Sequence, residues 1–481
     1  MVDSPVIVWL TRDLRLADNP ALRAAARQGP VVPLFILHDD RGADWPPGGA
    51  SRWWLAGSLR ALAGDLAALG SKLILRRGEP AAILPALARE TGAGAVNWSR
   101  AYEPDIMRAQ EAARTALEAD GVSVRRFGGR ILFEPEDVAT KDGSPYKVFT
   151  PFYKAVLARG VPSAPVAAPG RLDAPADWPA SEALDDWGLE PTKPDWAGGL
   201  RATWTPGERG ALDRLDWFLG EVAADYDKLR DRPDIDGTSR LSPYLTFGEV
   251  SPRRVWHAAQ ARADADSRAE SGIRAFLSEI VWREFSYHLL FHWPELPDTS
   301  WRPAFRDFPW AEDNEALHAW QRGRTGYPII DAAMRQLWKT GWMHNRARMI
   351  SASFLIKDLQ IPWQRGEAWF WDTLVDADLA SNAAGWQWVA GSGADAAPYF
   401  RVFNPALQGA KFDPDGAYVR RFVPELAYMP AKHIHAPWEA PADVLNEAGV
   451  RLGKTYPAPI VDHAAARKRA LAAYDAIKSA R

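Results

Sequence analysis

The sequence predicts an α/β domain built on a doubly wound parallel sheet, followed by a larger all-helical domain. Two patterns lead to this prediction. The first part of the chain alternates short, continuously apolar runs with Ala/Leu-rich helical patterns, whereas the second part is patterned almost wholly as helices. Because a strand that is apolar on both faces must be covered on both sides, the first pattern indicates a parallel sheet. With 481 residues, the chain also exceeds the length of one ordinary core.

Five strands, with helices between them, are expected in the first part of the chain. The apolar runs cover residues 6–10, 31–37, 72–76, 95–99 and 122–127, and helical patterns such as 20–28, 51–69 and 105–119 lie between them. Ligands of open parallel sheets lie beyond the carboxyl ends of the strands, so the sequence TRDLRL after the first strand is well placed for a site. No GxGxxG pattern follows that strand, which argues against the usual kind of dinucleotide-binding domain.

Changes in composition suggest the domain boundaries. We expect the α/β domain over residues 1–130, an interdomain linker over 131–205 and the all-helical domain over 206–481. The stretch VPSAPVAAPGRLDAPADWP within the linker is too rich in Pro, Ala and Asp to bury a core of its own. Segments such as GIRAFLSEIVWREFSYHLLF in the last part have the apolar spacing of helices.

The composition is that of a soluble globular protein, with 47% hydrophobic and 25% charged residues. The lack of cysteine excludes disulfides, thiolate catalysis and cysteine zinc sites. No apolar run reaches the roughly 20 residues that a membrane span needs, and the N-terminus has no cationic leader, so we expect a cytoplasmic protein without a membrane partner. A net charge of −3 argues against a general basic coat for nucleic acid but leaves room for a local basic groove.

A hydroxyl-rich motif, DGTSRLSPYL, leads into a helical pattern in the second part of the chain. Thr238, Ser239 and Ser242 can donate hydrogen bonds where a helix N-terminus presents free N–H groups, and Arg240 lies beside them. This combination suits a pyrophosphate. The alternative is ordinary helix capping by the same hydroxyl groups.

Three further motifs combine polar groups with tryptophan or other apolar residues. In EIVWREF, Glu279 and Arg283 are four residues apart, and the simplest interpretation is an exposed ion pair within a helix. WMHNRARM carries an amide and two arginines that need partners if half-buried, and a polar ligand would supply them. DADLASNAAGWQW ends with Trp386 and Trp388, which project about 200° apart on a helix and therefore serve different surfaces.

Other classes of site have less support. His288 and His292 have the spacing of metal ligands, but no third ligand candidate lies nearby in the sequence, so we predict no metal site. The GxSxG, Walker and kinase signatures do not occur, and hydrolase or phosphoryl-transfer chemistry therefore has no positive indication.

Taken together, the motifs resemble the photolyase/cryptochrome family, specifically its cyclobutane pyrimidine dimer photolyases. The resemblance is carried by DGTSRLSPYL, EIVWREF, TGYPIIDAAMRQLWKTGWMHNRARMISASFLIKDL, DADLASNAAGWQWVAGSGADAAPYFRVFNP and, near the start, VIVWLTRDLRLADNPAL. The stretch WPPGGASRWWL favours the class III photolyases. The resemblance implies a deoxyribodipyrimidine photolyase that binds FAD in its helical domain and repairs DNA containing cyclobutane pyrimidine dimers.

The resemblance also implies which residues bind cofactors. For FAD it indicates Tyr226, Thr238, Ser239, Arg240, Leu241, Ser242, Arg283, Asn345, Arg348, Asp376, Asp378 and Asn382. Asn382 would lie near flavin N5, where a neutral amide accepts or donates a hydrogen bond without adding charge. A carboxylate there could instead take a proton. For the antenna chromophore, the resemblance favours methenyltetrahydrofolate over a deazaflavin, although the Asn-Glu pair that holds the folate in some relatives is missing from YEPDIMRAQ.

Photolyases are among the enzymes that take their target bases out of the duplex, so the resemblance implies a lesion pocket. Tryptophan rings would offer their faces to the extruded dimer, Glu279 would hydrogen-bond to the base edges, and arginines would contact phosphates. The DNA- and lesion-binding residues indicated are Glu279, Trp282, Asn345, Arg346, Met349, Trp388, Arg230 and Arg401.

Electron transfer is the last role that the resemblance implies. Trp386, Trp363 and Trp310 would form a chain that carries electrons between the surface and the flavin. Trp386 would thus serve the flavin, while Trp388 would serve the dimer. Phe276 stands where several relatives carry a tryptophan, and its ring offers an apolar wall without an N–H donor.

The main alternative is a cryptochrome-type blue-light sensor with the same fold and FAD. Against it, the sequence DHAAARKRALAAYDAIKSAR resembles a closing helix rather than a long signalling tail. A (6-4) photolyase would carry a histidine pair where this chain has His344 and Asn345, and a single-strand-preferring DASH cryptochrome is a further alternative. A light-independent flavin oxidoreductase would need a nicotinamide site, for which the sequence has no motif. We expect a monomer.

Overall fold

The computed structural model describes residues 4–38, 44–396 and 400–479. The chain forms two compact units, and both combine segments that are distant in sequence. Unit 1 comprises Met1–Ala224 with Ser239–Pro294, and unit 2 comprises Asp225–Thr238 with Glu295–Arg481. The domain bounds of 1–130, 131–205 and 206–481, which were drawn from composition, stay a prediction.

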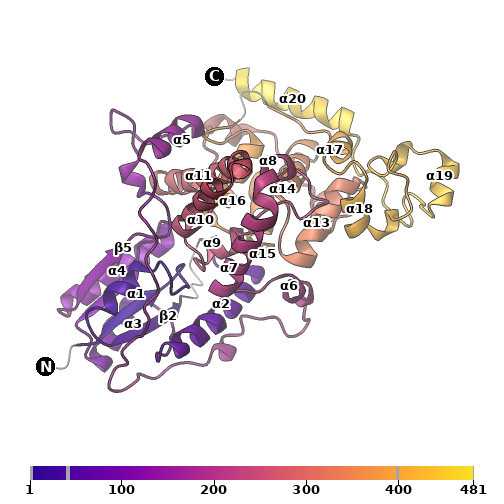
Figure 1. Cartoon of the computed structure of the whole chain (residues 1–481). Helices are drawn as coiled ribbons and strands as arrows, with labels where there is room; N and C mark the ends of the chain where they lie inside the picture. The colour runs from indigo at the N-terminus through magenta and orange to yellow at the C-terminus, as the bar shows by residue number, and fades with distance from the viewer. Residues whose placement is uncertain (1–3, 39–43, 397–399, 480–481) are drawn as a thin grey trace. The chain divides into compact units, whose positions relative to one another are not determined.

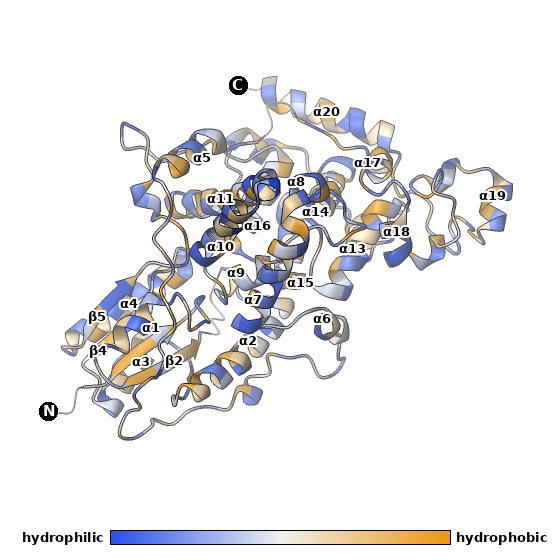
Figure 2. Ribbon diagram, viewed as in Figure 1, coloured by the Kyte–Doolittle hydropathy of each residue, from blue (hydrophilic) through white to orange (hydrophobic). Residues whose placement is uncertain are grey.

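The sheet of unit 1 has five parallel strands in the order β3-β2-β1-β4-β5. They are β1 (Val6–Leu10), β2 (Val31–Leu37), β3 (Ile74–Arg77), β4 (Ala95–Ser99) and β5 (Ser123–Phe127). The strands β1 and β2 are buried along their whole length, and β2 is strongly hydrophobic in Figure 2. The predicted doubly wound parallel sheet is therefore confirmed, and the expected strands agree with the observed ones to within two residues at each end.

Helices cover the sheet as the alternating pattern predicts (Figure 1). They are α1 (Pro20–Ala25), α2 (Gly49–Ala68), α3 (Pro80–Thr91) and α4 (Pro104–Ala119). Proline opens α1, α3 and α4, where its missing N–H costs no helical hydrogen bond. Buried Leu84 and Leu87 of α3 and Leu117 of α4 belong to one hydrophobic cluster with Ile7 and Trp9, two alternate residues of β1. This packing fills one face of the sheet with a single apolar layer.

The rest of unit 1 is helical. Its elements are η1 (Pro135–Asp137), α5 (Phe149–Ala158), η2 (Leu184–Trp187), α6 (Gly198–Thr203), α7 (Glu208–Trp217), η3 (Phe218–Val222), η4 (Ala223–Asp225, which ends in unit 2), α9 (Ser242–Thr246), α10 (Pro252–Ala265), η5 (Ser267–Ala269) and α11 (Glu270–His292). The predicted linker range thus contains the short helices η1, α5, η2 and α6, joined by irregular segments.

Buried polar side chains join the sheet of unit 1 to its helical segments. The Glu249 carboxylate accepts hydrogen bonds from Ser58 Oγ (2.5 Å) and Trp54 Nε1 (3.1 Å) of α2 and from the Gly207 N–H (2.6 Å). The Arg15 guanidinium, after β1, donates to the Gly248 carbonyl at 2.8 Å. Both side chains are almost fully buried, so each needs these partners to offset its desolvation.

TRDLRL therefore has a structural role in this protein. The Arg15 guanidinium also binds the carbonyls of Asp18 (2.7 Å) and Gly129 (3.0 Å), and the buried Asp13 carboxylate accepts from Ser99 Oγ at 2.7 Å. Asp18 forms a 2.6 Å ion pair with Arg253 of α10. The polar and charged side chains that follow β1 thus form hydrogen bonds and an ion pair within unit 1.

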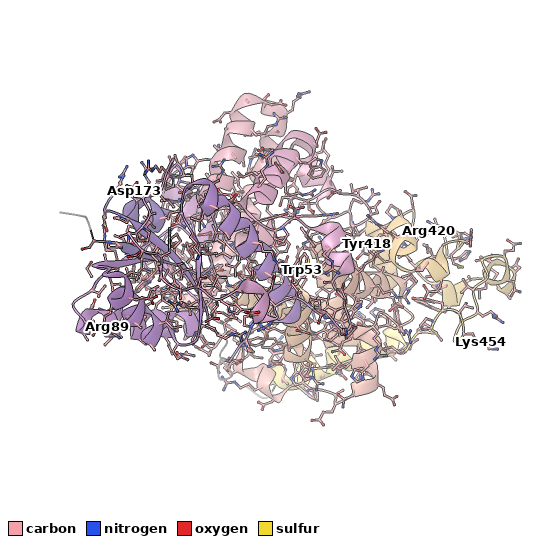
Figure 3. The ribbon with its side chains drawn as sticks, turned by 90° about the horizontal axis from the view of Figure 1, so that it is seen from below. Trp53, Arg89, Asp173, Tyr418, Arg420 and Lys454 are labelled. Carbon is pink, nitrogen blue, oxygen red and sulfur yellow. The ribbon has the colours of Figure 1, made fainter. Side chains whose placement is uncertain are left out.

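Apart from an isolated β-bridge between Leu452 and Tyr456, the regular elements in the described part of unit 2 are helices. Its elements are α8 (Tyr226–Leu229), η6 (Pro303–Asp307), α12 (Asn314–Gln321), α13 (Pro328–Thr340), α14 (Asn345–Ser353), η7 (Phe354–Asp358), α15 (Trp363–Thr373), α16 (Leu379–Ala390), α17 (Pro405–Phe412), α18 (Ala417–Phe422), η8 (Pro424–Leu426), η9 (Pro437–Glu439), α19 (Ala442–Glu447) and α20 (His463–Ser479). Tyr418 and Arg420 of α18 are labelled in Figure 3. The helical character of the second part of the chain is confirmed.

Asp331 fixes the start of α13 in unit 2. Its buried carboxylate accepts hydrogen bonds from Thr325 N and Oγ1, both at 2.7 Å, and from the Tyr456 hydroxyl at 2.7 Å. The residues that precede α13 and a distant C-terminal segment are thereby tied to one side chain. None of the helices in the described ranges is both long enough and apolar enough to cross a bilayer.

Glu249 generates a testable prediction on stability. Burial raises its pKa from 4.5 to about 8, so between these pH values the folded protein holds a proton that the unfolded chain releases. The free energy of unfolding should therefore fall as pH rises through this window, by up to about 1.4 kcal/mol per pH unit from this group. Denaturant unfolding of the wild type and of Glu249→Gln over this window measures the effect.

The variant should show a flatter dependence on pH, because it has no proton to lose. Glu447→Gln is the matched control, since Glu447 is exposed on α19. Equal slopes for the wild type and Glu249→Gln would assign the dependence to other groups.

Candidate functional site

The two polar motifs of unit 2 lie side by side. At the end of α13, Gly341 takes a left-handed conformation (φ 65°), and its carbonyl accepts from the Val375 N–H at 2.8 Å. Arg348 of α14 then reaches the buried Asp376 carboxylate at 2.7 Å. The sequences WMHNRARM and DADLASNAAGWQW are thereby brought together, and their opposite charges are paired. The predicted cofactor residues Arg348 and Asp376 are direct partners.

Asp378 sets the start of α16. Its side chain caps the helix by accepting from the Ser381 N–H at 2.8 Å. A capping carboxylate also interacts favourably with the positive end of the helix. The motif continues as one helix, α16, from Leu379 to Ala390. The helix therefore fixes the angular positions of Asn382, Trp386 and Trp388.

The orientation of the Asn382 amide follows from its partner. Its Nδ2 donates to the main-chain carbonyl of Glu367 in α15 at 3.2 Å. A carbonyl can only accept, so the amide must turn its Nδ2 toward α15. The Oδ1 atom is left as an acceptor for another group, and the Asn382 side chain is half-buried. The site therefore offers a neutral acceptor at this position on α16.

Trp386 lies in a closely packed contact between α15 and α16. A Cβ atom added to Gly366 would lie 2.1 Å from Cη2 of the Trp386 ring, so only glycine allows the two helices to approach this closely. The buried Trp386 ring contacts Phe370 (centroids 4.9 Å apart) and Trp320 (6.2 Å), both edge to face. Among the described residues, its indole N–H has no hydrogen-bond partner.

The other two predicted electron carriers are also in unit 2. Trp363 is fully buried at the first turn of α15 and donates through Nε1 to Ser300 Oγ at 3.2 Å. Trp310 is half-buried after η6, with its ring 4.4 Å from that of Phe308. Within the described part of the chain, the rings of Trp386, Trp363 and Trp310 are not in direct contact with one another. Their role as a chain stays a prediction.

The predicted lesion residues of unit 2 form a partly exposed group. Asn345 is exposed at the start of α14, and Arg346, Met349 and Trp388 are half-buried. The Arg346 guanidinium pairs with Asp231 at 2.7 Å, lies over the Phe412 ring and approaches Met349 Sδ at 3.8 Å. These three contacts fix the orientation of the Arg346 side chain. Arg401 is exposed, and Arg230 is half-buried with its guanidinium 5.6 Å from the centre of the Tyr226 ring.

The predicted lesion residues of unit 1 lie on α11. Glu279, Trp282 and Arg283 are all half-buried there. Trp282 stacks on Phe149 of α5, with ring centroids 3.5 Å apart and planes only 6° from parallel. One face of the Trp282 ring is therefore occupied by the protein.

The Arg283 guanidinium has partners both within α11 and in a distant segment of unit 1. It pairs with Glu284 at 3.0 Å, donates to the Arg130 carbonyl at 3.0 Å and lies over the Tyr287 ring. Burial raises the pKa of the neighbouring Glu284 carboxyl to about 7, although Arg283 opposes this shift. These contacts hold the guanidinium close to the surface of α11.

The hydroxyl-rich motif lies partly in each unit. Thr238 belongs to unit 2 and Ser239 to unit 1. Arg240 takes a left-handed conformation (φ 51°), which is uncommon for a residue other than glycine and points to a functional constraint. The Ser239 carbonyl accepts from Arg214 at 2.8 Å, Leu241 is buried before the five-residue α9, and Ser242 is exposed at its first turn.

Sequence reasoning missed three residues that contact or adjoin the predicted site residues. Gly366 and Glu367 lie between Trp363 and Phe370, and Glu367 is four residues after Trp363 on the buried face of α15. That spacing could have identified a buried acid, since the apolar residues of α15 recur at the same interval. Phe149 was also missed, because nothing in the sequence connects it with Trp282.

The histidine pair has a structural role in unit 1. His288 Nε2 accepts from the Tyr146 N–H at 3.0 Å, and its ring lies 4.6 Å from that of His292. Burial lowers the pKa of His288 to about 4, so the ring is neutral and can accept this hydrogen bond at neutral pH.

The sequence and structure match known proteins over nearly the whole chain. Residues 6–170 match the family model for DNA photolyase, and residues 276–476 match the model for the FAD binding domain of DNA photolyase. The chain is 55% identical over 476 residues to a deoxyribodipyrimidine photo-lyase of Agrobacterium fabrum, covering 99% of this chain and 98% of that protein.

Two further comparisons extend this result. The chain is 42% identical to cryptochrome-2 of Arabidopsis thaliana, covering 97% of this chain and 78% of that protein. The crystal structure of a bacterial class III photolyase from Agrobacterium tumefaciens matches with a TM-score of 0.96 and 54% identity, covering 100% of this chain and 98% of that chain.

The contact between α15 and α16 generates a testable prediction. Gly366→Ala should destabilise the protein by about 1–3 kcal/mol, because the added methyl group overpacks the space of the Trp386 ring. Gly64→Ala, in the middle of α2, is the control: its added Cβ meets no atom within 4 Å, so it should gain up to about 1 kcal/mol of helix propensity. Denaturant unfolding measures both, and an unchanged stability of Gly366→Ala would show that the two helices can separate without cost.

Proposed function

Because this chain belongs to the DNA photolyase family, we propose that it repairs cyclobutane pyrimidine dimers in DNA with light, using bound FAD as the electron donor. The observation that carries the proposal is the 55% identity over 476 residues to a deoxyribodipyrimidine photo-lyase. The enzyme is a lyase, since it splits the cyclobutane ring of its substrate.

The residues of unit 2 fit a flavin. Asn382 Oδ1 is a neutral acceptor on α16, and the buried indole N–H of Trp386 lacks a partner among the described side chains. A planar ligand fits these two groups if it has an N–H donor for Asn382 Oδ1 and an acceptor for the Trp386 N–H. The ionised Arg348–Asp376 pair is available to polar parts of the same ligand, where its charges remain matched.

Further cofactor contacts are proposed from the family resemblance. In unit 2 they are Tyr226, Thr238, Asn345 and Asp378, and in unit 1 they are Ser239, Arg240, Leu241, Ser242 and Arg283. The left-handed Arg240 supports this assignment, because strained residues recur at ligand sites. When bound and reduced, FAD supplies the electron that opens the dimer in the light.

We propose that residues of both units bind and orient the substrate. We assign the extruded dimer to Glu279 and Trp282 in unit 1 and to Asn345, Arg346, Met349 and Trp388 in unit 2. The Trp282 ring is held by Phe149 and the Arg346 side chain by Asp231, so both are oriented before DNA arrives. Arg230 and Arg401 are proposed phosphate contacts.

A second chromophore is part of the proposal. We assign methenyltetrahydrofolate to unit 1, with a deazaflavin as the alternative. The support is the sequence WPPGGASRWWL, which leads into α2, and the match to a class III photolyase. Trp53 of this sequence lies on α2 and is labelled in Figure 3. We also propose that the protein acts as a cytoplasmic monomer.

The second candidate function is a blue-light sensor with the same cofactor. The 42% identity to a plant cryptochrome favours it. At the position near flavin N5, however, this chain has the neutral Asn382, whereas an aspartate would resemble the plant cryptochromes. The identity to the photolyase is also higher than that to the cryptochrome.

Repair can be tested directly. Reduced, purified protein is illuminated with blue light in the presence of a short duplex that carries one thymine dimer, and intact thymines are counted against a dark control. Light-dependent restoration supports the proposal. If FAD is bound and no thymines are restored, the sensor function becomes the better account.

Trp388 provides a test of the lesion site. Trp388→Ala should weaken binding to duplex DNA with one thymine dimer by about 1–3 kcal/mol, the range for loss of one base-stacking ring. Binding to undamaged duplex should change little, because phosphate contacts dominate it. The matched control is Trp338→Ala, since Trp338 is 58% exposed on α13 and stacks only on Trp369 among the described rings. Equal affinity of Trp388→Ala and the wild type would remove Trp388 from the site.

Trp310 provides a test of the electron chain. Trp310→Phe should slow the light-driven reduction of oxidised FAD, because phenylalanine is much harder to oxidise than tryptophan. The measurement follows FAD absorbance under blue light with an external reductant, and repair by chemically reduced enzyme is measured in parallel. A deficit in photoreduction alone assigns Trp310 to the chain. A deficit in both assays would instead indicate a role in folding, and normal photoreduction would show that another route carries the electrons.

A further inference from the structure

Glu367 is a buried acid without a partner at the centre of the proposed site. It lies on α15 with no exposed surface, and neither carboxyl oxygen accepts or donates a hydrogen bond among the described residues. Leaving a buried polar group unpaired costs about 1–3 kcal/mol, and more for a charged one. Such a group in a folded protein requires an explanation, because a methionine of similar size would avoid the cost.

The backbone of Glu367 lies next to the two residues that are proposed to face the flavin. Its carbonyl accepts the Asn382 Nδ2 hydrogen bond at 3.2 Å, and its neighbour Gly366 packs against the Trp386 ring. Glu367 is thus fixed next to Asn382, which is proposed to face the flavin, and next to Trp386, which is proposed to deliver the electron. Perturbed acids at such positions are more often functional than acids elsewhere in a protein.

Burial favours the neutral form of the Glu367 carboxyl. Burial raises its pKa well above the usual 4.5, and the charge of Asp298 adds to this effect. No arginine or lysine among the described residues pairs with it to hold the charged form. An uncompensated buried carboxylate is unfavourable, so the proton stays on the side chain until another charge nearby changes.

We propose that Glu367 stores a proton behind Asn382 and releases it when an electron passes from Trp386 to the bound flavin. This inference rests on the proposed function. In the step, one electron leaves the Trp386 indole and enters the flavin. The O–H bond of Glu367 breaks, and an N–H bond forms on the flavin. Glu367 ends as a carboxylate and Trp386 as a cation, so no net charge is created.

The two new charges offset each other. Glu367 and Trp386 belong to helices that pack in direct contact, and the opposite charges attract strongly in a medium of low polarity. Electrons that arrive through Trp310 and Trp363 then reduce the cation on Trp386. Glu367 takes up a proton from solvent again. The stored proton makes the first electron transfer independent of proton entry from water.

Infrared spectroscopy tests the stored proton without relying on activity. The protein stripped of FAD should show a protonated carboxyl C=O band at neutral pH that is missing in Glu367→Gln. In FAD-loaded protein, this band should decrease on illumination in the wild type and show no such change in Glu367→Gln. Retention of the band in Glu367→Gln would overturn the proposal, because another acid would then be its source.

Photoreduction rates give the second readout. From about pH 6 to about pH 9 the wild-type rate should be nearly constant, whereas the Glu367→Gln rate should fall with rising pH and be at least about tenfold lower at the alkaline end. Glu367→Asp keeps an acid and should restore part of the rate. Asp372→Asn, which removes an exposed acid from the same helix, is the matched control.

The outcomes separate this inference from the proposed function. FAD content and light-driven repair are measured on the wild type first. If it binds FAD and repairs dimers, and Glu367→Gln is reduced as fast at every pH, the proton store is wrong and the proposed function stands. If the wild type binds no FAD, both are wrong. Thermal unfolding of each variant identifies any loss of folding.

Discussion

Unit 1 depends on polar side chains that are buried and hydrogen-bonded within it. Glu249 holds Trp54 and Ser58 of α2 together with the backbone of Gly207, and Arg15 binds the carbonyl of Gly248 beside it. A buried polar or charged group that loses its hydrogen-bond partners is costly, because water no longer solvates it. The strands and the helices α9 to α11 therefore form one body, although β5 ends at Phe127 and α9 begins only at Ser242.

Unit 2 is organised by a different constraint, the close approach of α15 and α16 at Gly366. That contact fixes three groups relative to one another: the Trp386 ring, the Asn382 amide and the Glu367 carboxyl. The Trp386 ring and the Glu367 carboxyl both have polar atoms that find no hydrogen-bond partner among the described residues. A site built on two packed helices holds its groups more rigidly than one built on loops, and rigid placement is what electron and proton transfer require.

Much of this could be predicted from the sequence, and the reasons are local. Continuous apolar runs identified β1 and β2, because both strands are buried along their whole length. The resemblance located Asn382, Trp386 and Trp388 on one segment, and helical spacing separated the two rings. The stacking of Trp282 on Phe149 could not be predicted, since it joins α11 to α5 across more than a hundred residues. The role of TRDLRL was not predictable either, because Arg15 finds its partners in distant backbone carbonyls.

The stack of Phe149 on Trp282 has a consequence for the entropy of binding. An indole that is free in solution must give up its rotational freedom when it closes on a base, at a cost of about 0.5–1.5 kcal/mol for a side chain. Phe149 removes that freedom during folding, long before any DNA is present. A flipped base that met the open face of Trp282 would thus find a rigid platform, and the free energy of its stacking would go into affinity rather than into ordering the protein.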